Sequence, residues 1–95
     1  MKKVEITVGV AAYNEELNIK RTLDAILSQK ATHFSISKII VNSDGSNDQT
    51  DQIVKSFKNS KIVLFADGGR KGKASRVNEI MAAAKTEILV LLDAD

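Results

Sequence analysis

Two carboxylates, Asp93 and Asp95, stand directly after an apolar run and are separated by one alanine. If the run is a β-strand, residues two apart point to the same side. Two carboxylates on one side can hold a hard divalent cation such as Mg²⁺ or Mn²⁺, with coordination positions left for phosphate oxygens. A pair of solvated acids at a strand end is the alternative, and the tripeptide alone favours it.

A basic, glycine-rich segment offers a place for phosphate. Four cations lie within the seven residues from Arg70 to Arg76, with no acid among them, and glycines stand at 68, 69 and 72. Glycines let backbone N–H groups approach an anion, and a helix that begins here adds positive potential. The segment suits a diphosphate, although a mobile basic surface loop fits this stretch equally well.

Two phosphate-binding fingerprints fail on particular residues. The P-loop pattern GxxxxGK[ST] needs glycine at 67 and Ser or Thr at 74, where the chain has Asp67 and Ala74. A dinucleotide fingerprint needs glycines after the first apolar run, where residues 11–14 read Ala-Ala-Tyr-Asn. One histidine, His33, which we expect to be exposed, and no cysteine disfavour a catalytic triad and a zinc protease.

A third polar segment, Asp44-Gly45-Ser46, follows the second apolar run. Its carboxylate could accept a hydrogen bond from a base N–H or a ribose hydroxyl. Asp, Gly and Ser are also common turn formers, and this segment alone favours a plain turn.

Four apolar runs alternate with amphipathic stretches, which predicts the order β-α-β-α-β-α-β. We expect strands at residues 4–10, 39–41, 62–65 and 88–92. A first helix is expected after an N-cap at Asn14, with Leu17 on its apolar face, and a second after a capping box at 46–49. A third is expected at about 74–85, with Met81 in its apolar stripe.

Strands that alternate with helices imply a parallel sheet with right-handed crossovers. The fold class is therefore α/β: half of a three-layer, Rossmann-like fold, with strand order 3-2-1-4 and helices on both faces. Glu5 alternates into the first, central strand, so we place it near the strand's entry end. Ligands of such sheets bind beyond the carboxyl ends of the strands. Four polar segments should thus converge on one crevice: residues 11–16, 43–48, 67–76 and 93–95. This location favours a cation site at Asp93 and Asp95 over a pair of solvated acids.

Composition sets broad limits. The 95 residues suit one small domain, and 43% apolar with 27% charged residues is typical of a globular chain. The net charge of +2, from 14 basic and 12 acidic side chains, is too small to indicate nucleic-acid or general membrane binding. No apolar run approaches the ~20 residues of a membrane span, and no signal peptide opens the chain. The chain stops directly after an apolar run, with two acids at its tip, which suggests a piece of a longer protein.

Taken together, the four segments resemble the N-terminal part of a family 2 glycosyltransferase with the GT-A fold. Residues 8–16 resemble the family's apolar strand followed by P-x-Y-N-E-E, and residues 40–50 resemble V-D-D-G-S-x-D-x-T. Residues 72–78 resemble G-K-x-x-A-x-N, and residues 91–95 resemble the D-x-D metal motif. Ala11 replaces the family's proline and Ser43 its first acid, and the looser match at 74–77 leaves the role of Arg76 in doubt.

The resemblance implies nucleotide-sugar binding by six residues: Ala12, Tyr13, Glu15, Asp44, Lys73 and Asp93. Asp44 would read the base, commonly uracil, and Lys73 would meet the diphosphate. Asp93 would contact the ribose or a metal-bound water. Asp95 would ligate a Mg²⁺ or Mn²⁺ ion, which neutralises the departing nucleoside diphosphate. The parent enzyme would transfer a sugar from a nucleoside diphosphate, most commonly UDP, to an acceptor hydroxyl with inversion.

Several expectations concern the chain as a whole. Residues 1–95 would be the truncated donor-binding part, with the acceptor half absent, the catalytic base beyond Asp95, and no turnover by the fragment. The apolar strand 88–92 would form an exposed edge and pair into a homo-oligomer. We expect a cytoplasmic protein, or one at the cytoplasmic face of a membrane if the parent has spans. The alternative is a non-catalytic regulatory or receiver-like module with Asp67 as the phosphorylated acid, but alanines stand where its acidic pair would be.

Overall fold

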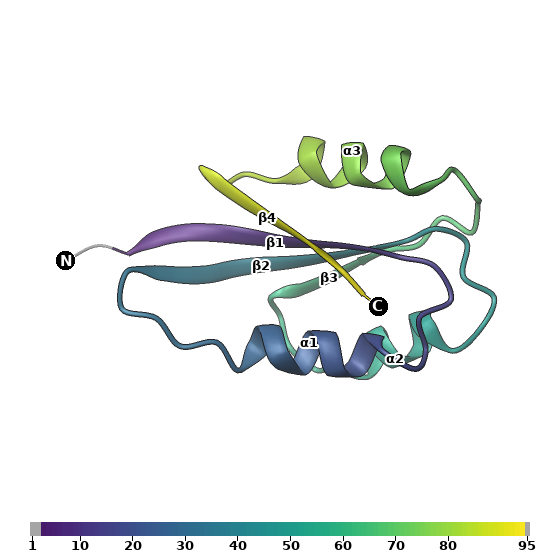
Figure 1. Cartoon of the computed structure of the whole chain (residues 1–95), viewed down its shortest axis with the longest axis horizontal. Coiled ribbons are helices and arrows are strands. Elements are labelled where there is room, and N and C mark those ends of the chain that lie inside the picture. The colour runs from purple at the N-terminus through teal and green to yellow at the C-terminus, as the bar shows by residue number, and fades with distance from the viewer. Residues whose placement is uncertain (1–2, 95) are drawn as a thin grey trace.

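A sheet of four parallel strands lies between two layers of helices in the computed structural model, which describes residues 3–94 (Figure 1). The strands are β1 (Val4–Ala12), β2 (Phe34–Ser43), β3 (Ile62–Phe65) and β4 (Ile88–Asp93). The helices are α1 (Ile19–Leu27), α2 (Thr50–Ser56) and α3 (Lys73–Ala83). The strand order is β3-β2-β1-β4, which confirms the predicted order and the α/β class.

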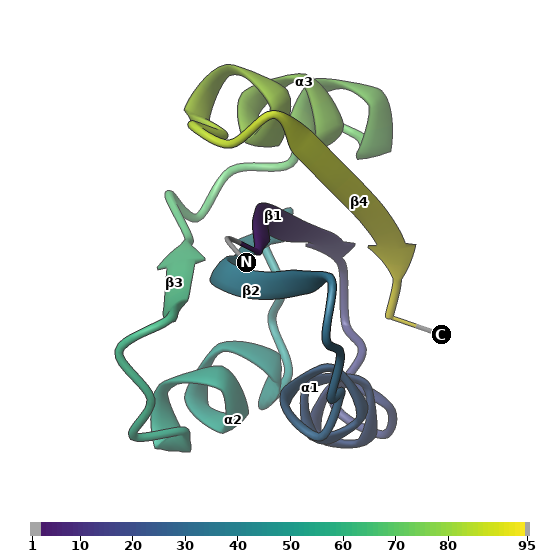
Figure 2. The ribbon, with the colours of Figure 1, turned by 90° about the vertical axis from the view of Figure 1, so that its left-hand side faces the viewer.

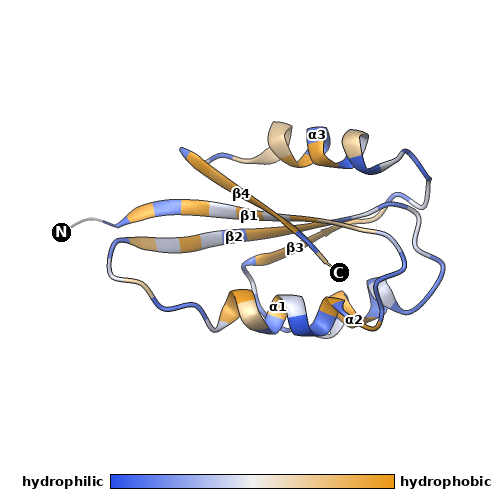
Figure 3. Cartoon of the chain, in the orientation of Figure 1, coloured by the Kyte–Doolittle hydropathy of each residue, from blue (hydrophilic) through white to orange (hydrophobic). Residues whose placement is uncertain are grey.

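The two central strands hold the core. Helices α1 and α2 cover one face of the sheet and α3 covers the other (Figure 2). Val10 of β1 and Val41 of β2 are fully buried, and Leu23 of α1 packs with them. Figure 3 shows apolar residues along the strands, and Ile19, Leu23 and Ile26 form the buried side of α1. Burying each such side chain contributes roughly 1.5–3 kcal/mol, so this packing fixes the layers that carry the site.

The strand registers bring the carboxyl ends to one level. Ala12 of β1 pairs with Ser43 of β2, and Ala11 pairs with Asp93 of β4. The Asp44 N–H continues the ladder by donating to the Ala12 carbonyl at 2.8 Å. The polar segments that follow these strands therefore begin side by side.

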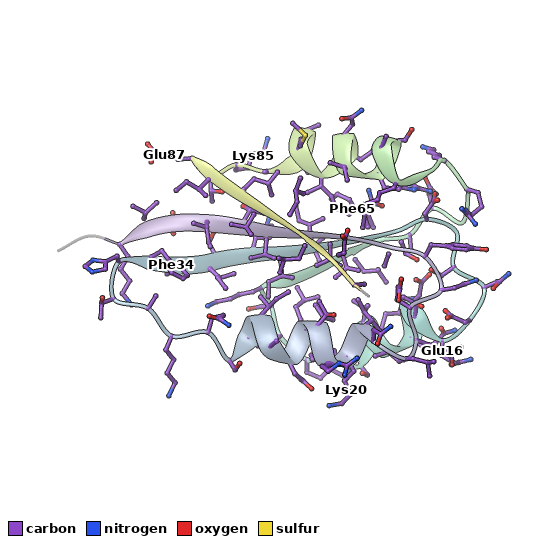
Figure 4. The ribbon with its side chains drawn as sticks, in the orientation of Figure 1. Glu16, Lys20, Phe34, Phe65, Lys85 and Glu87 are labelled. Carbon is purple, nitrogen blue, oxygen red and sulfur yellow. The ribbon has the colours of Figure 1, made fainter. Side chains whose placement is uncertain are left out.

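The opposite end of the sheet carries the strand entries. In Figure 4, Phe34 and Glu87 lie at that end, and Glu16 lies at the other, in the loop that follows β1. Glu5 is exposed near the start of β1, and His33 is exposed, both as predicted. Strand β2 begins at Phe34, five residues before the predicted start, so the connection before it is shorter than expected.

The predicted start of the first helix is wrong. Helix α1 begins at Ile19, and Leu17 is 90% exposed. Asn14 has a φ of 50° and its side-chain oxygen accepts a hydrogen bond from the Asn47 N–H at 2.9 Å. The Glu15 N–H donates to the Thr50 hydroxyl at 2.8 Å. Bonds between two loops that are distant in sequence thus take the place of a local cap.

The capping box predicted before α2 is wrong for a similar reason. The Ser46 hydroxyl bonds to the Ser43 hydroxyl at 2.8 Å and accepts from the Asn14 N–H at 3.1 Å, so it caps no helix. An oxygen of Asp48 instead accepts the Thr50 N–H at 2.9 Å. Helix α3 begins at Lys73 and ends at Ala83, close to the prediction, but Met81 is 56% exposed and lies outside its buried stripe.

Among residues 3–94, strand β4 pairs only with β1 and so forms an edge of the sheet. Its apolar residues remain exposed by 37–45%: Ile88, Val90, Leu91 and Leu92. The exposed apolar edge predicted for residues 88–92 is therefore confirmed. Across residues 3–94, no helix has the length and apolar character needed to cross a membrane.

Candidate functional site

A cavity of about 290 Å³ lies at the carboxyl ends of the strands. It is lined by residues from all four polar segments: Ala11, Ala12, Tyr13, Glu15, Asp44, Arg70, Lys73, Arg76, Asp93 and Ala94. The predicted convergence on one crevice is therefore confirmed. All six residues predicted to bind the nucleotide sugar line this cavity, although their roles in binding stay predictions.

Asp44 is buried at the cavity and its carboxylate is saturated with donors. One oxygen accepts the Lys71 N–H at 2.6 Å and the Arg76 Nε–H at 2.9 Å. The other accepts the Gly72 N–H at 3.0 Å and the Arg70 Nε–H at 3.1 Å. The segment after β3 is thus folded around the acid that directly follows β2.

Arg76 is the most deeply buried charge at the site, with its side chain 2% exposed. Besides Asp44, its guanidinium contacts Asp67 at 2.8 Å and Glu79 at 2.9 Å, and it donates to the Gly69 carbonyl. A buried charge is tolerated only when it is paired and hydrogen-bonded, and these partners supply both. Arg76 thereby ties α3 to β2 and to the loop after β3.

These contacts shift the pKa values of the network. The Lys71 N–H is the main cause that lowers the pKa of Asp44 to about 2, with Arg76, Gly72 and Arg70 adding to it against the effect of burial. The side chain of Asn42, followed by Arg76 and Lys71, lowers the pKa of Glu79 to about 2. Arg76 holds the pKa of Asp67 well below its ordinary value. All three acids are therefore ionised near neutral pH.

Arg70 and Tyr13 form the outer wall of the cavity. The Arg70 Cζ atom lies 3.5 Å from the centroid of the Tyr13 ring, so the guanidinium is stacked on the ring face. Tyr13 is 39% exposed, and the Arg70 side chain is 55% exposed. An aromatic face at the mouth of a cavity is a surface on which a planar ligand can stack.

Lys73, at the first position of α3, forms an ion pair with Asp93 at 2.5 Å. The pair places an ammonium group and a carboxylate together at the cavity, beside the N-terminus of a helix of 11 residues. An ammonium group and a helix N-terminus both suit phosphate. The carboxylate suits a divalent cation that keeps water and phosphate oxygens among its ligands.

The side chains that could ligate a metal ion are few, but they are compatible with a divalent cation. Mg²⁺ is commonly held by one or two carboxylates together with substrate phosphates. Asp93 provides one carboxylate at the cavity, and the predicted ligand Asp95 lies outside the described residues. Within residues 3–94, no group of three acidic, histidine or cysteine side chains could hold a metal ion alone. With the described residues alone, a cation here would take further ligands from the phosphates of a bound nucleotide.

The sequence did not reveal the part played by Arg76, although one signal was available. Arg76 stands four residues before Ile80, and both are buried on the same face of α3. An arginine on the buried face of a helix needs carboxylate partners. Asp67, the acid that a receiver-like module would phosphorylate, is one of these partners and is ion-paired with Arg76.

Comparison with known proteins assigns the chain that carries this site to a family. The family model described as glycosyl transferase family 2 matches residues 7–95. A poly-β-1,6-N-acetyl-D-glucosamine synthase of Staphylococcus epidermidis is 36% identical over 91 residues, which are 95% of this chain and 21% of that protein. The enzyme of the same name from Staphylococcus aureus is 33% identical over 91 residues and is covered to the same extent. The chain thus spans about a fifth of the length of these curated relatives.

Solved structures support the same assignment. A mannosyltransferase from Pyrobaculum calidifontis, in complex with GDP-Man and Mn²⁺, has a TM-score of 0.85 and 30% identity, over 99% of this chain and 28% of that one. A glucosyl-3-phosphoglycerate synthase from Mycobacterium tuberculosis, in complex with Mn²⁺, UDP and glucosyl-3-phosphoglycerate, has a TM-score of 0.75 and 26% identity, over 97% of this chain and 34% of that one. This likeness and the strand order confirm the predicted Rossmann-like half of a GT-A fold. The chain belongs to glycosyl transferase family 2.

Proposed function

We propose that this chain is the donor-binding part of a glycosyltransferase, and that its cavity binds a nucleoside-diphosphate sugar together with Mg²⁺ or Mn²⁺. The carrying observation is the lining of one cavity: an aromatic ring, a buried carboxylate, three cations and an acid at a strand end. Two structural neighbours are complexes with nucleotides and Mn²⁺, which supports this assignment.

The proposed roles follow from the chemical groups that line the cavity. The ring of Tyr13 and the carboxylate of Asp44 meet the nucleoside, with Ala12 and Glu15 beside them. Lys73 meets the diphosphate, and Asp93 meets the ribose or a water on the cation. The cation, when bound, stabilises the negative charge that develops on the leaving nucleoside diphosphate.

We propose UDP as the nucleotide, in a transfer to an acceptor hydroxyl with inversion. One structural neighbour contains UDP and another contains GDP-Man. The preference of this chain for uracil or guanine can therefore be tested by comparing the two nucleotides. Calorimetric titration of the chain with UDP and with GDP, each with Mg²⁺, tests this choice. We expect tighter binding of UDP, and tighter binding of GDP would contradict it.

We further propose that the 95-residue chain does not turn over by itself. Its curated relatives are about five times as long. Within residues 3–94, the acids that line the cavity are Glu15, Asp44 and Asp93, and all three have proposed places at the nucleotide sugar. A coupled assay for UDP release from UDP-sugars checks this, and steady release by the purified chain would contradict it. The predicted location in the cytoplasm or at its membrane face stays a prediction.

Oligomerisation through β4 is also part of the proposal. The strand presents an unpaired backbone edge, and Val90 and Leu92 border an apolar hollow of about 530 Å³ beside α1. Unpaired, apolar edges favour pairing with another chain. Light scattering should show a dimer or larger species that Leu92→Lys weakens, and a monomer at high concentration would argue against this pairing.

Donor binding itself is tested by titrating UDP with Mg²⁺ into the chain while recording amide NMR spectra. We expect shifts around Asp44, Lys73 and Asp93 at millimolar nucleotide or below. Lys73→Ala should weaken the binding, whereas Lys58→Ala, the same change at an exposed position away from the cavity, should leave it unchanged. Equal affinities for both variants, or no shifts at all, would refute the proposed site.

A further inference from the structure

We propose that Arg70 occupies the place of the nucleobase in the free protein, and that a base binds by displacing its guanidinium. This inference rests on the proposed function of the cavity and concerns how that cavity selects its ligand. It makes Arg70 a specificity-determining residue, placed between the two groups that would recognise a base.

The carboxylate of Asp44 has no acceptor position left for a base. A carboxylate offers about four lone-pair sites, and Asp44 receives four donors, two on each oxygen. Three of these donors are fixed by the fold, because two are backbone N–H groups and the third belongs to the buried Arg76. Only Arg70 donates from a side chain that is more than half exposed, at 55%. A base N–H can therefore reach Asp44 at the position of Arg70 without opening the loop.

The ring of Tyr13 is also occupied by Arg70. The guanidinium of Arg70 lies on the ring face that is within reach of Asp44, because one side chain makes both contacts. A base that stacks on this face and bonds to Asp44 needs both places that Arg70 fills. The two contacts are vacated together when one side chain rotates outward.

Arginine resembles the ligand that we propose it replaces. A guanidinium is planar, stacks on aromatic rings and donates N–H groups in its own plane. The replacing base must likewise bring an N–H donor at its ring edge, as uracil does at N3 and guanine does at N1. The displaced guanidinium remains beside a cavity that Lys73 also lines, where it adds positive charge for a diphosphate. The cost of displacement is thus offset for a nucleotide but not for a nucleoside.

The test compares uridine with UDP, both in the presence of Mg²⁺, by NMR titration of the full chain. Arg70→Ala should bind uridine about 3- to 30-fold more tightly than the wild type, since an ion pair that is exposed only on its Arg70 side and an exposed cation–π contact no longer compete with the base. The UDP-to-uridine affinity ratio should fall in the same variant because the released charge is missing. Arg70→Lys, which keeps the charge without the planar fork, should gain uridine affinity and keep more of the UDP affinity.

Arg21→Ala is the matched control, because Arg21 is an exposed arginine of α1 that does not line the cavity. It should leave both affinities unchanged. A second outcome is that UDP binds while Arg70→Ala and Arg70→Lys bind uridine no more tightly than the wild type. In that case Arg70 does not occupy the place of the base, but the proposed nucleotide-sugar site still holds. If UDP does not bind the wild-type chain, the proposed function fails and this inference fails with it.

Discussion

Replacing Gly45 by alanine tests whether the loop after β3 is docked on the end of β2. Gly45 has a φ of 69°, a conformation that costs other residues roughly 1–3 kcal/mol. A Cβ atom placed on it would lie 2.8 Å from the Gly69 carbonyl oxygen and 3.0 Å from the Gly69 carbonyl carbon. These atoms belong to the backbone, so the docked loop itself would have to move.

Gly68→Ala supplies the matched control. Gly68 also has a positive φ, of 85°, but a Cβ atom there meets nothing within 4 Å. Gly68→Ala should therefore reduce the free energy of unfolding by the strain alone, about 1–3 kcal/mol. Gly45→Ala should add an overpacking cost of about 1–3 kcal/mol, for a total of roughly 2–6 kcal/mol.

Urea unfolding measures how much free energy of unfolding each variant loses, and amide hydrogen exchange shows which residues lose protection. Because the Lys71 and Gly72 N–H groups donate to Asp44, their protection should fall sharply in Gly45→Ala and remain in Gly68→Ala. If the two variants lose the same free energy within about 0.5 kcal/mol and retain the same protection, the docking of the loop against Gly45 is refuted.

Three further predictions use other parts of the chain. The pKa values of Asp44 and Glu79 are lowered to about 2 from 3.8 and 4.5, so the unfolded chain takes up protons first as the pH falls. The free energy of unfolding should be steady above about pH 5 and decline from about pH 4.5 towards pH 2, and Asp44→Asn should flatten that decline in acid titrations followed by circular dichroism. Leu23→Ala should cost about 2–5 kcal/mol in urea unfolding because the side chain is fully buried, whereas Leu17→Ala, at a site 90% exposed, should stay within about 0.5 kcal/mol. Removing Mg²⁺ with EDTA should weaken calorimetric binding of UDP and leave that of uridine unchanged, since only the diphosphate needs the cation; equal losses would argue against a cation at the phosphates.

The strands and their order could be predicted because they depend on patterns that the chain carries locally. Short apolar runs that alternate with amphipathic stretches leave few topologies once crossovers are right-handed. The convergence of Tyr13, Asp44 and Asp93 followed from the same reasoning, because carboxyl ends of parallel strands meet at one edge. The core side of α1 was also visible in its periodicity, apart from Leu17.

The errors arise where long-range contacts replace local ones. Asn14 and Ser46 have the types and positions of helix caps, yet each bonds to the other loop instead. Arg76 has acidic partners at 44, 67 and 79. Glu79 is a neighbour on the same helix, but Asp44 and Asp67 lie in the segments that follow β2 and β3, and no local pattern brings those two acids to Arg76. Hydrogen bonds between loops and ion pairs among distant residues depend on the assembled fold, whereas periodicity depends on one element at a time.

Asp44 has to serve two purposes at once, and its four donors show how it can do so. As a structural anchor, it must keep the Lys71 and Gly72 N–H groups and the Arg76 guanidinium in place, because these order the loop and the start of α3. As a proposed reader of the base, it must also leave one acceptor position within reach of a ligand. Both requirements are met only if the fourth donor can be exchanged, and Arg70 is the donor whose side chain is exposed. An acidic side chain with three fixed donors and one exchangeable donor remains satisfied both with and without its ligand, so the fold does not have to bury a bare carboxylate in either state.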